Sequence, residues 1–352
     1  MDRKYAEFAA QKAIELLAID SPSGFADKAT DWVVEEFSSL GFKAKKTVKG
    51  GVLTDLGGTD VDDALLLEAH ADTLGGMVCE IKGDGRLKIT NIGGMNANNA
   101  EAENVRVYTR DGKIYEGTAQ LINASLHVNG EYNDIKRTFD SIEIVLDEDV
   151  KNADDVHALG IENGDYICFD TKTTVTENGF LKSRFIDDKA SVACLITAAH
   201  VMQKAGYVPE NDIKIVFTMY EEVGHGGAWM PQVRSMLGVD MGCIGLDLSC
   251  TEHDVSICAK DAGGPYDFDL TSRLVDLAKA AELSFAVDLY PFYGSDVGAM
   301  WHGGNDIPGA LIGPGVHASH GMERTHFDGI ANTVALILLY FGVDIPEHTE
   351  AD

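Results

Sequence analysis

The sequence has little that could cross-link the chain or anchor it in a membrane. Its six cysteines include no C-x-x-C pair, and most lie inside apolar runs, as small buried thiols do. No apolar run is long enough to span a bilayer, and the opening stretch MDRKYAEFAAQKAIELLAID lacks the continuous apolar segment of a signal peptide. We therefore expect no disulfides, no thiolate zinc site, no membrane partner and a cytoplasmic location.

Basic residues are also scarce, with 28 Lys and Arg against 57 Asp and Glu, which gives a formal net charge of −29. A field of this sign repels nucleic acid and anionic membrane surfaces, so the composition argues against polyanion partners. A hydrophobic fraction of 45% over 352 residues is enough for a large packed core. The chain is therefore expected to be globular.

Apolar patterning predicts an α/β fold, with a mostly parallel or mixed sheet and helices on both faces. Apolar runs of strand length alternate with amphipathic stretches of helical period, which is the pattern of a sheet covered by helices. Helices are expected near residues 5–17, 29–40 and 191–205, and strands near 64–69, 213–220, 243–248 and 310–313.

Residues 73–175 differ in character and predict an inserted all-β domain. Gly, Asn and Asp turns separate short β-like pieces there, and Asp84-Gly85 and Asp111-Gly112 each indicate a hairpin. We therefore divide the chain into an α/β domain, residues 1–72 plus 176–352, and a barrel-like insertion, residues 73–175.

Histidine and carboxylate side chains follow three of the predicted strands at the point where each strand ends. His70 and Asp72 follow ALLLEA, Glu221 and Glu222 follow IKIVFTMY, and Asp247 ends CIGLD. Ligands of open α/β sheets bind beyond the carboxyl ends of the strands, so these residues are expected to meet at one edge. Any one motif alone would more often be a loop, a solvated helix face or a helix cap, and only their joint placement indicates a site.

The residue types at this edge favour a catalytic metal site. One imidazole with several carboxylates and no thiolate suits a divalent ion such as Zn, Co or Mn, with positions open for water. Two such ions would share a bridging carboxylate and activate a water, whose proton another carboxylate must accept. Glu221 and Glu222 can divide the roles of base and ligand, and Asp72 is spaced to fix the metal-binding tautomer of His70.

Five segments in order resemble the tetrahedral (TET) or glutamyl-aminopeptidase-like family of co-catalytic metallopeptidases: HAD, FIDDKAS, YEEVG, GLDLS and a histidine-rich stretch before the last helix. The resemblance covers nearly the whole chain and implies a metal-dependent aminopeptidase with Glu221 as general base. It implies that Asp187 bridges two divalent ions, with Zn as first choice, and that the Asp187–Asp188 peptide is cis. The implied ligands are His70, Asp187, Glu222, Asp247 and one C-terminal histidine.

That last histidine is the point at which the sequence departs from the family pattern, which has a histidine followed by Ser and, a few residues later, Glu. The segment GPGVHASHGMERTH offers His317, His320 and His326. We prefer His320 because it shortly precedes Glu323, we keep His317 as the alternative, and we expect His326 at the start of the final helix. A further departure is Thr73, where the family pattern has glutamate after the aspartate.

The resemblance also implies partners. Family members form dimers and then tetrahedral dodecamers through the inserted domain, so residues 73–175 would serve in dimerisation or as a lid, and peptides would be the substrates. The stretches PFYGSDVGAMWHGG and GPGVHASHGMERTH resemble a branch of the family that is associated with genes for a blocked-dipeptide osmoprotectant.

Three other functions fit the same residues. The first is a carboxypeptidase, and the second is a two-metal amidohydrolase or dipeptidase that acts on a small peptide-like solute. The third is a non-catalytic, metal-stabilised binding protein, which would hold fully coordinated metals without exchangeable water. A requirement for a free amino terminus would separate an aminopeptidase from the first two.

Overall fold

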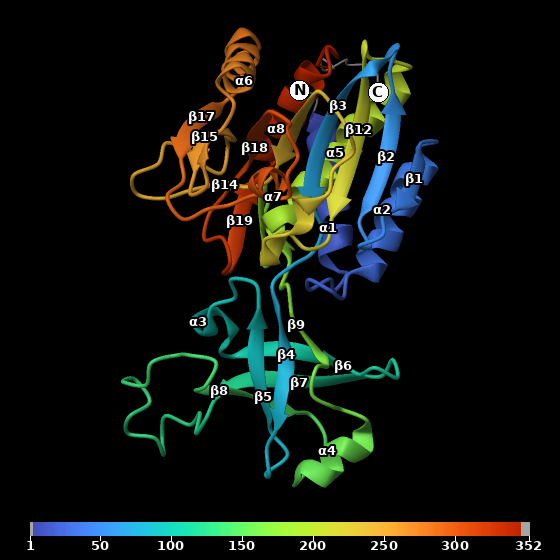
Figure 1. The fold of residues 1–352 in the computed structure, drawn as a ribbon. Helices are drawn as coiled ribbons and strands as arrows, with labels where there is room; N and C mark the ends of the chain where they lie inside the picture. Colours follow the sequence, from blue (N-terminus) through green and yellow to red (C-terminus); the bar gives the residue numbers. More distant parts are fainter. Residues whose placement is uncertain (1–2, 346–352) are drawn as a thin grey trace.

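The computed structural model describes residues 3–345 and shows an α/β domain with a small β-barrel attached to one end (Figure 1). The strands of the main sheet are β1 (Lys43–Lys46), β2 (Val52–Gly57), β3 (Asp60–His70), β12 (Asn211–Thr218), β13 (Ser235–Val239), β14 (Gly242–Cys243), β15 (Val255–Asp261), β16 (Gly264–Pro265), β17 (Phe285–Leu289) and β18 (Gly309–Val316). Their order is β1-β2-β12-β3-β13-β18-β15-β16, with β14 beside β18 and β17 beside β15.

The centre of this sheet is parallel and its flanks are antiparallel. Strands β12, β3, β13 and β18 run in one direction, whereas β2 and β15 oppose their inner neighbours. The predicted mixed sheet is confirmed, as are the strands predicted near 64–69, 213–220 and 310–313. The strand predicted at 243–248 is wrong, because residues 235–239 already fill the position between β3 and β18.

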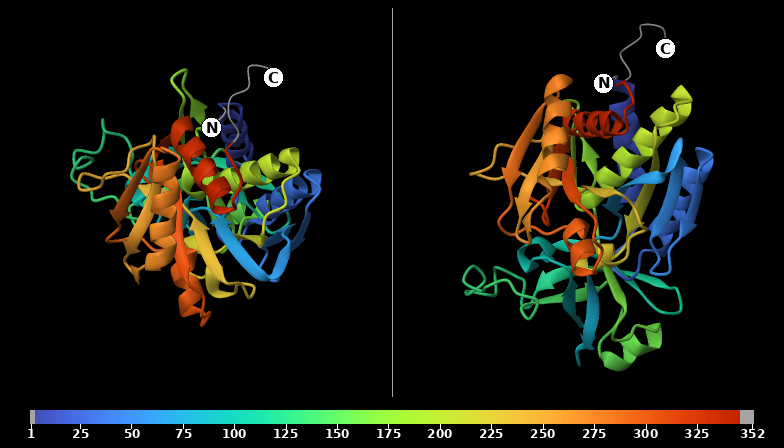
Figure 2. Two further views of the ribbon diagram at one scale, coloured as in Figure 1. Left: turned by 90° about the horizontal axis from the view of Figure 1, so that it is seen from above. Right: turned by 45° about the horizontal axis from the view of Figure 1, so that its top comes forward.

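Helices cover both faces of the sheet, but unequally. Leu65 and Leu67 of β3 belong to the large core with α1, α2, α5, α6 and α8, whereas Leu66 points to the opposite face and packs with Val297 and Met300 of α7. Helices α1, α5 and α8 lie side by side (Figure 2). Across residues 3–345, none of the helices has the length and apolarity needed to cross a membrane. The helices are α1 (Arg3–Leu17), α2 (Asp27–Ser39), α5 (Ile186–Ala205), α6 (Phe268–Ala280), α7 (Asp296–His302) and α8 (Phe327–Tyr340).

The inserted segment forms a closed barrel. Its strands are β4 (Gly75–Ile81), β5 (Leu87–Ile92), β6 (Glu103–Tyr108), β7 (Ile114–Leu121), β8 (Ile142–Leu146) and β9 (Tyr166–Phe169), joined in the order β4-β5-β8-β7-β6-β9, with α3 (Ala97–Ala100) and α4 (Ala153–Leu159) outside. Both predicted hairpins are confirmed, with Gly85 (φ 81°) and Gly112 (φ 86°) in the left-handed conformation that their turns require.

A small third sheet connects the barrel to the α/β domain. Its strands are β10 (Thr174–Val175), β11 (Phe180–Ser183) and β19 (Glu323–His326), in the order β10-β11-β19. In its register Ser183 lies opposite Glu323 and Phe180 lies opposite His326. Strand β11 leads directly into α5, so this sheet holds the FIDDKAS segment against the histidine-rich segment of the sequence.

The barrel also docks on the α/β domain through an ion-pair group around Asp20. Arg106 of β6 donates two hydrogen bonds to the Asp20 carboxylate, at 2.7 and 2.8 Å, and the Tyr108 hydroxyl donates a third at 2.6 Å. Asp20 lies in the loop after α1, so these contacts tie the barrel wall to the first helix of the α/β domain. The hydrogen bonds keep the pKa of the Asp20 carboxyl below its usual value, despite the burial that opposes this shift.

Candidate metal centre

The carboxyl edge of the parallel strands gathers most of the predicted site residues. His70 is the last residue of β3, and Glu221 and Glu222 lie in the one-turn 3₁₀ helix η1 (Glu221–Val223) that follows β12. Asp187 lies at the start of α5, and its peptide bond to Asp188 is cis, as the family resemblance implies.

Asp187 lies between two histidines, with one carboxylate oxygen facing each. Its Oδ1 is 3.2 Å from His70 Nε2, and its Oδ2 is 3.5 Å from His320 Nε2. Glu222 Oε2 is also 3.5 Å from His320 Nε2, and Glu221 Oε2 is 3.6 Å from His70 Nε2. Ligand atoms around one tetrahedral ion at ~2.0–2.1 Å are separated by roughly 3.3 Å. The spacing therefore suits two ions that share Asp187, each with its own histidine.

Asp240 joins this cluster, and Asp247 does not. Asp240 directly follows β13, is 4% exposed, and lies within ligand distance of His70, Glu221 and Asp187. Asp247 lies in an exposed turn after β14. Asp240, and not Asp247, therefore lies at the place in the cluster where the sequence predicted a ligand. The two residues end similar runs, LGVD and IGLD, and the pairing of β13 with β3 and β18 decides which of them reaches the edge.

Asp72 holds the site together from behind. Its carboxylate accepts backbone N–H groups from Glu221 (3.1 Å) and Glu222 (3.4 Å), and it also accepts the Ser23 hydroxyl. His70 Nδ1 is closer to the backbone oxygen of Asp72, at 3.0 Å, than to its carboxylate, at 3.5 Å. A proton on Nδ1 that is donated to Asp72 leaves Nε2 of His70 free for a cation. The backbone oxygen of Asp72 therefore orients the ring more than the Asp72 side chain, for which this role is predicted.

His320, rather than His317, faces the cluster. His317 is exposed and forms a backbone bridge to Arg324, whereas His320 adopts a left-handed conformation (φ 62°) that turns its ring toward Asp187. Glu323 fixes this geometry, because its carboxylate accepts the backbone N–H of His320 at 2.9 Å and that of Asp187 at 3.0 Å. Sequence reasoning used Glu323 only as a landmark and missed this role.

The inserted barrel forms one wall around His320. Asn99 of α3 donates to the His320 backbone oxygen at 2.9 Å, and the Gly94 carbonyl lies 3.4 Å from His320 Nδ1. A Cβ atom on Gly94 would lie 2.6 Å from the same nitrogen, so only glycine leaves room for the ring. The site is therefore built from both domains.

Negative charge dominates the cluster. In residues 3–345, histidines are the only ion-pair partners of Asp187 and Glu222. Lys189 lies two residues after Asp187, but its ammonium donates to the backbone oxygens of Leu16 and Ile19 instead. Burial, followed by the charge of Asp187, raises the pKa of Glu222 well above its ordinary value.

The donor set fits divalent cations. Among the described residues, the buried Oδ1 atoms of Asp188 and Asp240 have no hydrogen-bond partner. A buried carboxylate oxygen without a donor is unfavourable unless a proton or a metal ion neutralises it. Imidazole and carboxylate donors suit Zn, Co or Mn.

A second layer of buried polar groups lies behind the Glu221–Glu222 turn, and sequence reasoning did not identify it. Thr218 donates to Asp296 at 2.5 Å and is 3.3 Å from Glu68, and the Gly227 N–H donates to Asp296 at 2.6 Å. Asp296 thereby fixes the loop that follows Glu222. Burial, followed by the charge of Asp296, raises the pKa of Glu68 well above its ordinary value.

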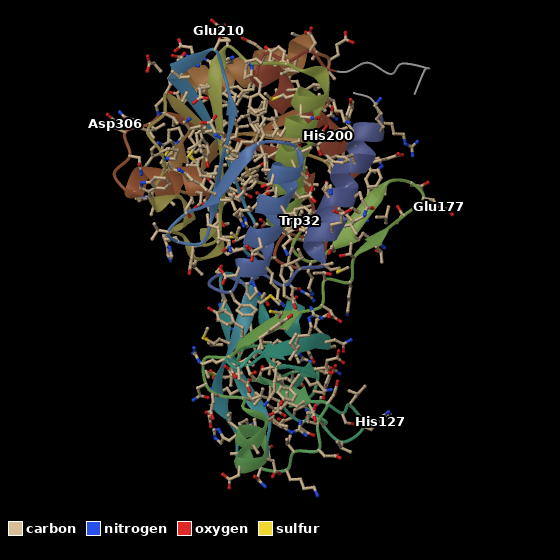
Figure 3. The ribbon with its side chains drawn as sticks, turned by 90° about the vertical axis from the view of Figure 1, so that its right-hand side faces the viewer. Trp32, His127, Glu177, His200, Glu210 and Asp306 are labelled. Carbon is tan, nitrogen blue, oxygen red and sulfur yellow. The ribbon has the colours of Figure 1, made fainter. Side chains whose placement is uncertain are left out.

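A cavity of about 810 Å³ opens beside the cluster. The segment from Tyr290 to Ser295 lines it together with five residues of the cluster, Asp187, Glu221, Glu222, Asp240 and His320. His302 also lines this cavity. Two other histidines lie elsewhere: Figure 3 shows His127 on the barrel and His200 in the helical layer, where its ring stacks on Phe8. The cavity size is adequate for a residue of a peptide substrate.

Comparison with known proteins identifies relatives along nearly the whole chain. The family model described as M42 glutamyl aminopeptidase matches residues 50–336. YhfE of Bacillus subtilis (strain 168), which is named provisionally as an aminopeptidase, is 40% identical over 334 residues, which cover 93% of this chain and 95% of YhfE.

Solved structures share the same fold. Aminopeptidase APDkam598 from the archaeon Desulfurococcus kamchatkensis aligns with a TM-score of 0.85 at 21% identity, over 96% of this chain and 94% of that one. The TET1 peptidase of Pyrococcus horikoshii, described as assembling into a tetrahedron or a large octahedral shell, aligns with a TM-score of 0.83 at 20% identity, over 95% of this chain and 99% of that one.

Substitution of Asp240 tests the corrected ligand set. Asp240→Asn should reduce bound metal by about one equivalent per subunit, because an amide is a weaker ligand and brings no charge. Asp247→Asn, the matched control, should retain the metal content of the unmodified protein. Elemental analysis after equilibrium dialysis measures both, and metal loss in the control alone would restore Asp247 as the ligand.

The metal-free protein should lose stability as the pH rises from about 4 to about 8. Burial, followed by the charge of Asp187, raises the pKa of Asp240 to about 7 and that of Glu323 to about 8. In an unfolded chain such groups titrate near ~4, so across this window the folded state holds protons that the unfolded state has lost. Melting temperatures of chelator-treated protein should therefore be lower at about pH 8 than at about pH 5.5.

Metal-loaded protein is the control for this pH dependence, because bound cations replace the protons and should reduce the difference. A metal-free melting temperature that rises over the same window would contradict the assignment of raised pKa values to these buried carboxyls.

Proposed function

Because the chain belongs to the M42 glutamyl aminopeptidase family, and is therefore a hydrolase of the aminopeptidase class, we propose that the buried cluster is its two-metal catalytic centre. The observation that carries this proposal is the division of the Asp187 oxygens between His70 and His320. Asp240 would complete the set around His70, and Glu222 the set around His320. Zn is the preferred metal, with Co or Mn as alternatives, and we keep a cytoplasmic location as part of the proposal.

The reaction assigned to this site is hydrolysis of the first peptide bond. Two divalent ions held there would lower the pKa of water and polarise the scissile carbonyl. Glu221 accepts the proton of the attacking water at its carboxylate and returns it to the leaving amine. Its side chain lines the cavity and keeps 14% exposure, so it can reach a substrate. In the metal-free protein, burial raises the pKa of Glu221 well above its ordinary value.

The charge of the cavity favours peptides with a free amino terminus. Carboxylates of the cluster line one side of the cavity, and neither lysine nor arginine is among its lining residues in the described chain. Two divalent ions would offset much of the carboxylate charge, but a terminal carboxylate of a substrate would still find no lysine or arginine to bind it. We therefore prefer an aminopeptidase to a carboxypeptidase, and also to an amidohydrolase for blocked peptides.

The same cavity suits a neutral first side chain. Its wall includes Met241, Cys243 and Leu248. Its one carboxylate beyond the cluster, Asp261, is already used: Oδ1 accepts the Gly263 N–H at 2.7 Å and Oδ2 accepts the Tyr266 hydroxyl at 2.7 Å. A substrate lysine would find no free acid in this wall, and a substrate glutamate would find no lysine or arginine, with His302 as the one basic side chain beyond the cluster among the described residues.

Glu221→Gln should lower kcat by a factor of about 10²–10⁴ and leave the metal content unchanged, because the amide cannot accept the proton. The adjacent Glu222→Gln is the matched control, in which metal should be lost. Stopped assays on an amino-acid amide and elemental analysis of the same samples separate the two roles. Metal loss in Glu221→Gln, or undiminished hydrolysis, would overturn the assignment of the base.

Leucine amide and leucine-initiated peptides should be hydrolysed with a kcat/KM at least ~10-fold higher than their glutamate and lysine counterparts, because only the apolar side chain is compatible with the wall. Amino-terminally blocked leucine peptides should be inert. Steady-state kinetics on this panel provides the measurement. A preference for glutamate or lysine would contradict the proposed side-chain class, and hydrolysis of blocked peptides would contradict the aminopeptidase reaction.

We also propose that the chain forms a homo-oligomer built from dimers, with the inserted barrel in the contact and a tetrahedral dodecamer as the complete assembly. The support is the fold shared with the TET1 peptidase of Pyrococcus horikoshii. Light scattering coupled to gel filtration should therefore give a mass well above the 37.9 kDa of one chain. A monomer under all conditions would end this part of the proposal.

A further inference from the structure

A second group of metal-ligating side chains lies away from the catalytic cluster. It consists of His253, in the loop before β15, His326, the last residue of β19, and Asp328, in the first turn of α8. Asp328 Oδ2 is 2.9 Å from His253 Nδ1 and 3.2 Å from His326 Nδ1. One ligand atom from each residue lies within 4.8 Å of the other two. A single carboxylate oxygen therefore faces two imidazole nitrogens.

The protons available to His326 do not satisfy this arrangement. Its Nε2 lies 2.6 Å from the Asn178 backbone oxygen and must carry a hydrogen there. In the neutral ring Nδ1 is then a bare acceptor, in agreement with the Asp328 N–H that it accepts at 3.0 Å. Asp328 Oδ2 lies 3.2 Å from the same Nδ1, so in the neutral ring two acceptors are in contact without a proton between them. Either a proton on Nδ1 or a metal ion between the two atoms would remove this repulsion.

The surrounding residues hold the two rings in place. The side-chain amide of Asn332 in α8 donates to the His253 backbone oxygen at 2.9 Å, and the backbone N–H of His326 donates to the backbone oxygen of Glu252 at 3.2 Å. The Phe180 ring packs edge-to-face against both imidazoles, with ring-centroid distances of 5.8 Å to His253 and 4.8 Å to His326. A ligating histidine usually donates its other ring N–H to a carbonyl or carboxylate, and the contact with Asn178 has that form. Asn178 lies next to Glu177, which is labelled on the β10–β11 turn in Figure 3.

We propose that His253, His326 and Asp328 form a divalent-metal site that is distinct from the catalytic centre. The nitrogen-to-oxygen separations of 2.9 and 3.2 Å are close to the roughly 3.3 Å expected around one tetrahedral ion. Two imidazoles and one carboxylate favour borderline ions such as Zn²⁺, Ni²⁺ or Cu²⁺ over Mg²⁺ or Ca²⁺. The side chains of His253 and Asp328 are 45% and 64% exposed, which leaves room for water ligands.

Binding has an identifiable cost. His253 must lose the Nδ1 proton that it donates to Asp328. Nδ1 of His326 must give up the hydrogen bond that it accepts from the backbone N–H of Asp328, which caps α8. The site is therefore weaker than the buried catalytic cluster, and it releases a proton when it is occupied. Occupation would join the 252–254 loop, β19 and α8. Strand β19 also carries Glu323, which positions Asp187 and His320, so the ion would stiffen a strand that supports the catalytic site.

Zinc content measures occupation of the site. The unmodified protein, His253→Ala, Asp328→Asn and a control should be dialysed to equilibrium against the same micromolar Zn²⁺ and analysed for bound zinc per subunit. His157→Ala is the matched control, because His157 Nδ1 lies 2.9 Å from Glu162, with exposures of 46% and 56%, but has no second histidine. The comparison is a difference between variants, so it does not depend on how many ions the catalytic cluster binds.

His253→Ala and Asp328→Asn should each bind about one zinc fewer than the unmodified protein, and His157→Ala should bind the same number. Added Zn²⁺ should also raise the melting temperature less in these two variants than in the control. Equal zinc content in all four proteins would overturn the proposal, and so would an equal loss in His157→Ala. If His253→Ala does not fold, the nearly isosteric Asp328→Asn decides the question alone.

Discussion

Buried negative charge is the constraint on which the rest of this structure depends. Several separate stretches of chain bring carboxylates to one edge of the sheet, where histidines are their nearest basic partners and the closest buried lysine is turned away. Such a cluster is tolerated only when protons or cations neutralise it. Under the proposed function, the ions that allow catalysis would also stabilise the fold. The strand order, the left-handed turn at His320 and the docking of the barrel all maintain that arrangement.

The part of the site that follows from local pattern could be predicted from sequence. His70, Glu221 and Glu222 each come directly after a buried apolar run, and the carboxyl ends of parallel strands share one edge. Asp187 has no such local mark and came only from the family resemblance. Asp240 was missed because two adjacent runs end in aspartate, and only long-range pairing with β3 and β18 distinguishes them.

Features that depend on contacts between distant segments of the chain could not be predicted from the sequence. The Asp84-Gly85 and Asp111-Gly112 turns predicted two hairpins, but closure of the barrel depends on pairs such as β4 with β9, whose residues lie far apart in the chain. The orienting role of Glu323 likewise requires β19 to pair with β11, and the meeting of His253 with His326 requires β19 to lie beside the 252–254 loop. None of these three residues has neighbours in the sequence that reveal its role.

The close approach of Gly94 to the His320 ring makes both domains part of the proposed catalytic site, although they look modular. An insertion of this size could be regarded as an accessory that evolution added for assembly and might exchange freely. Here its backbone forms part of the wall around a proposed ligand, and Asn99 fixes the carbonyl of the same residue. A chimera that replaces this barrel with one from a distant relative would therefore have to restore the contact with His320.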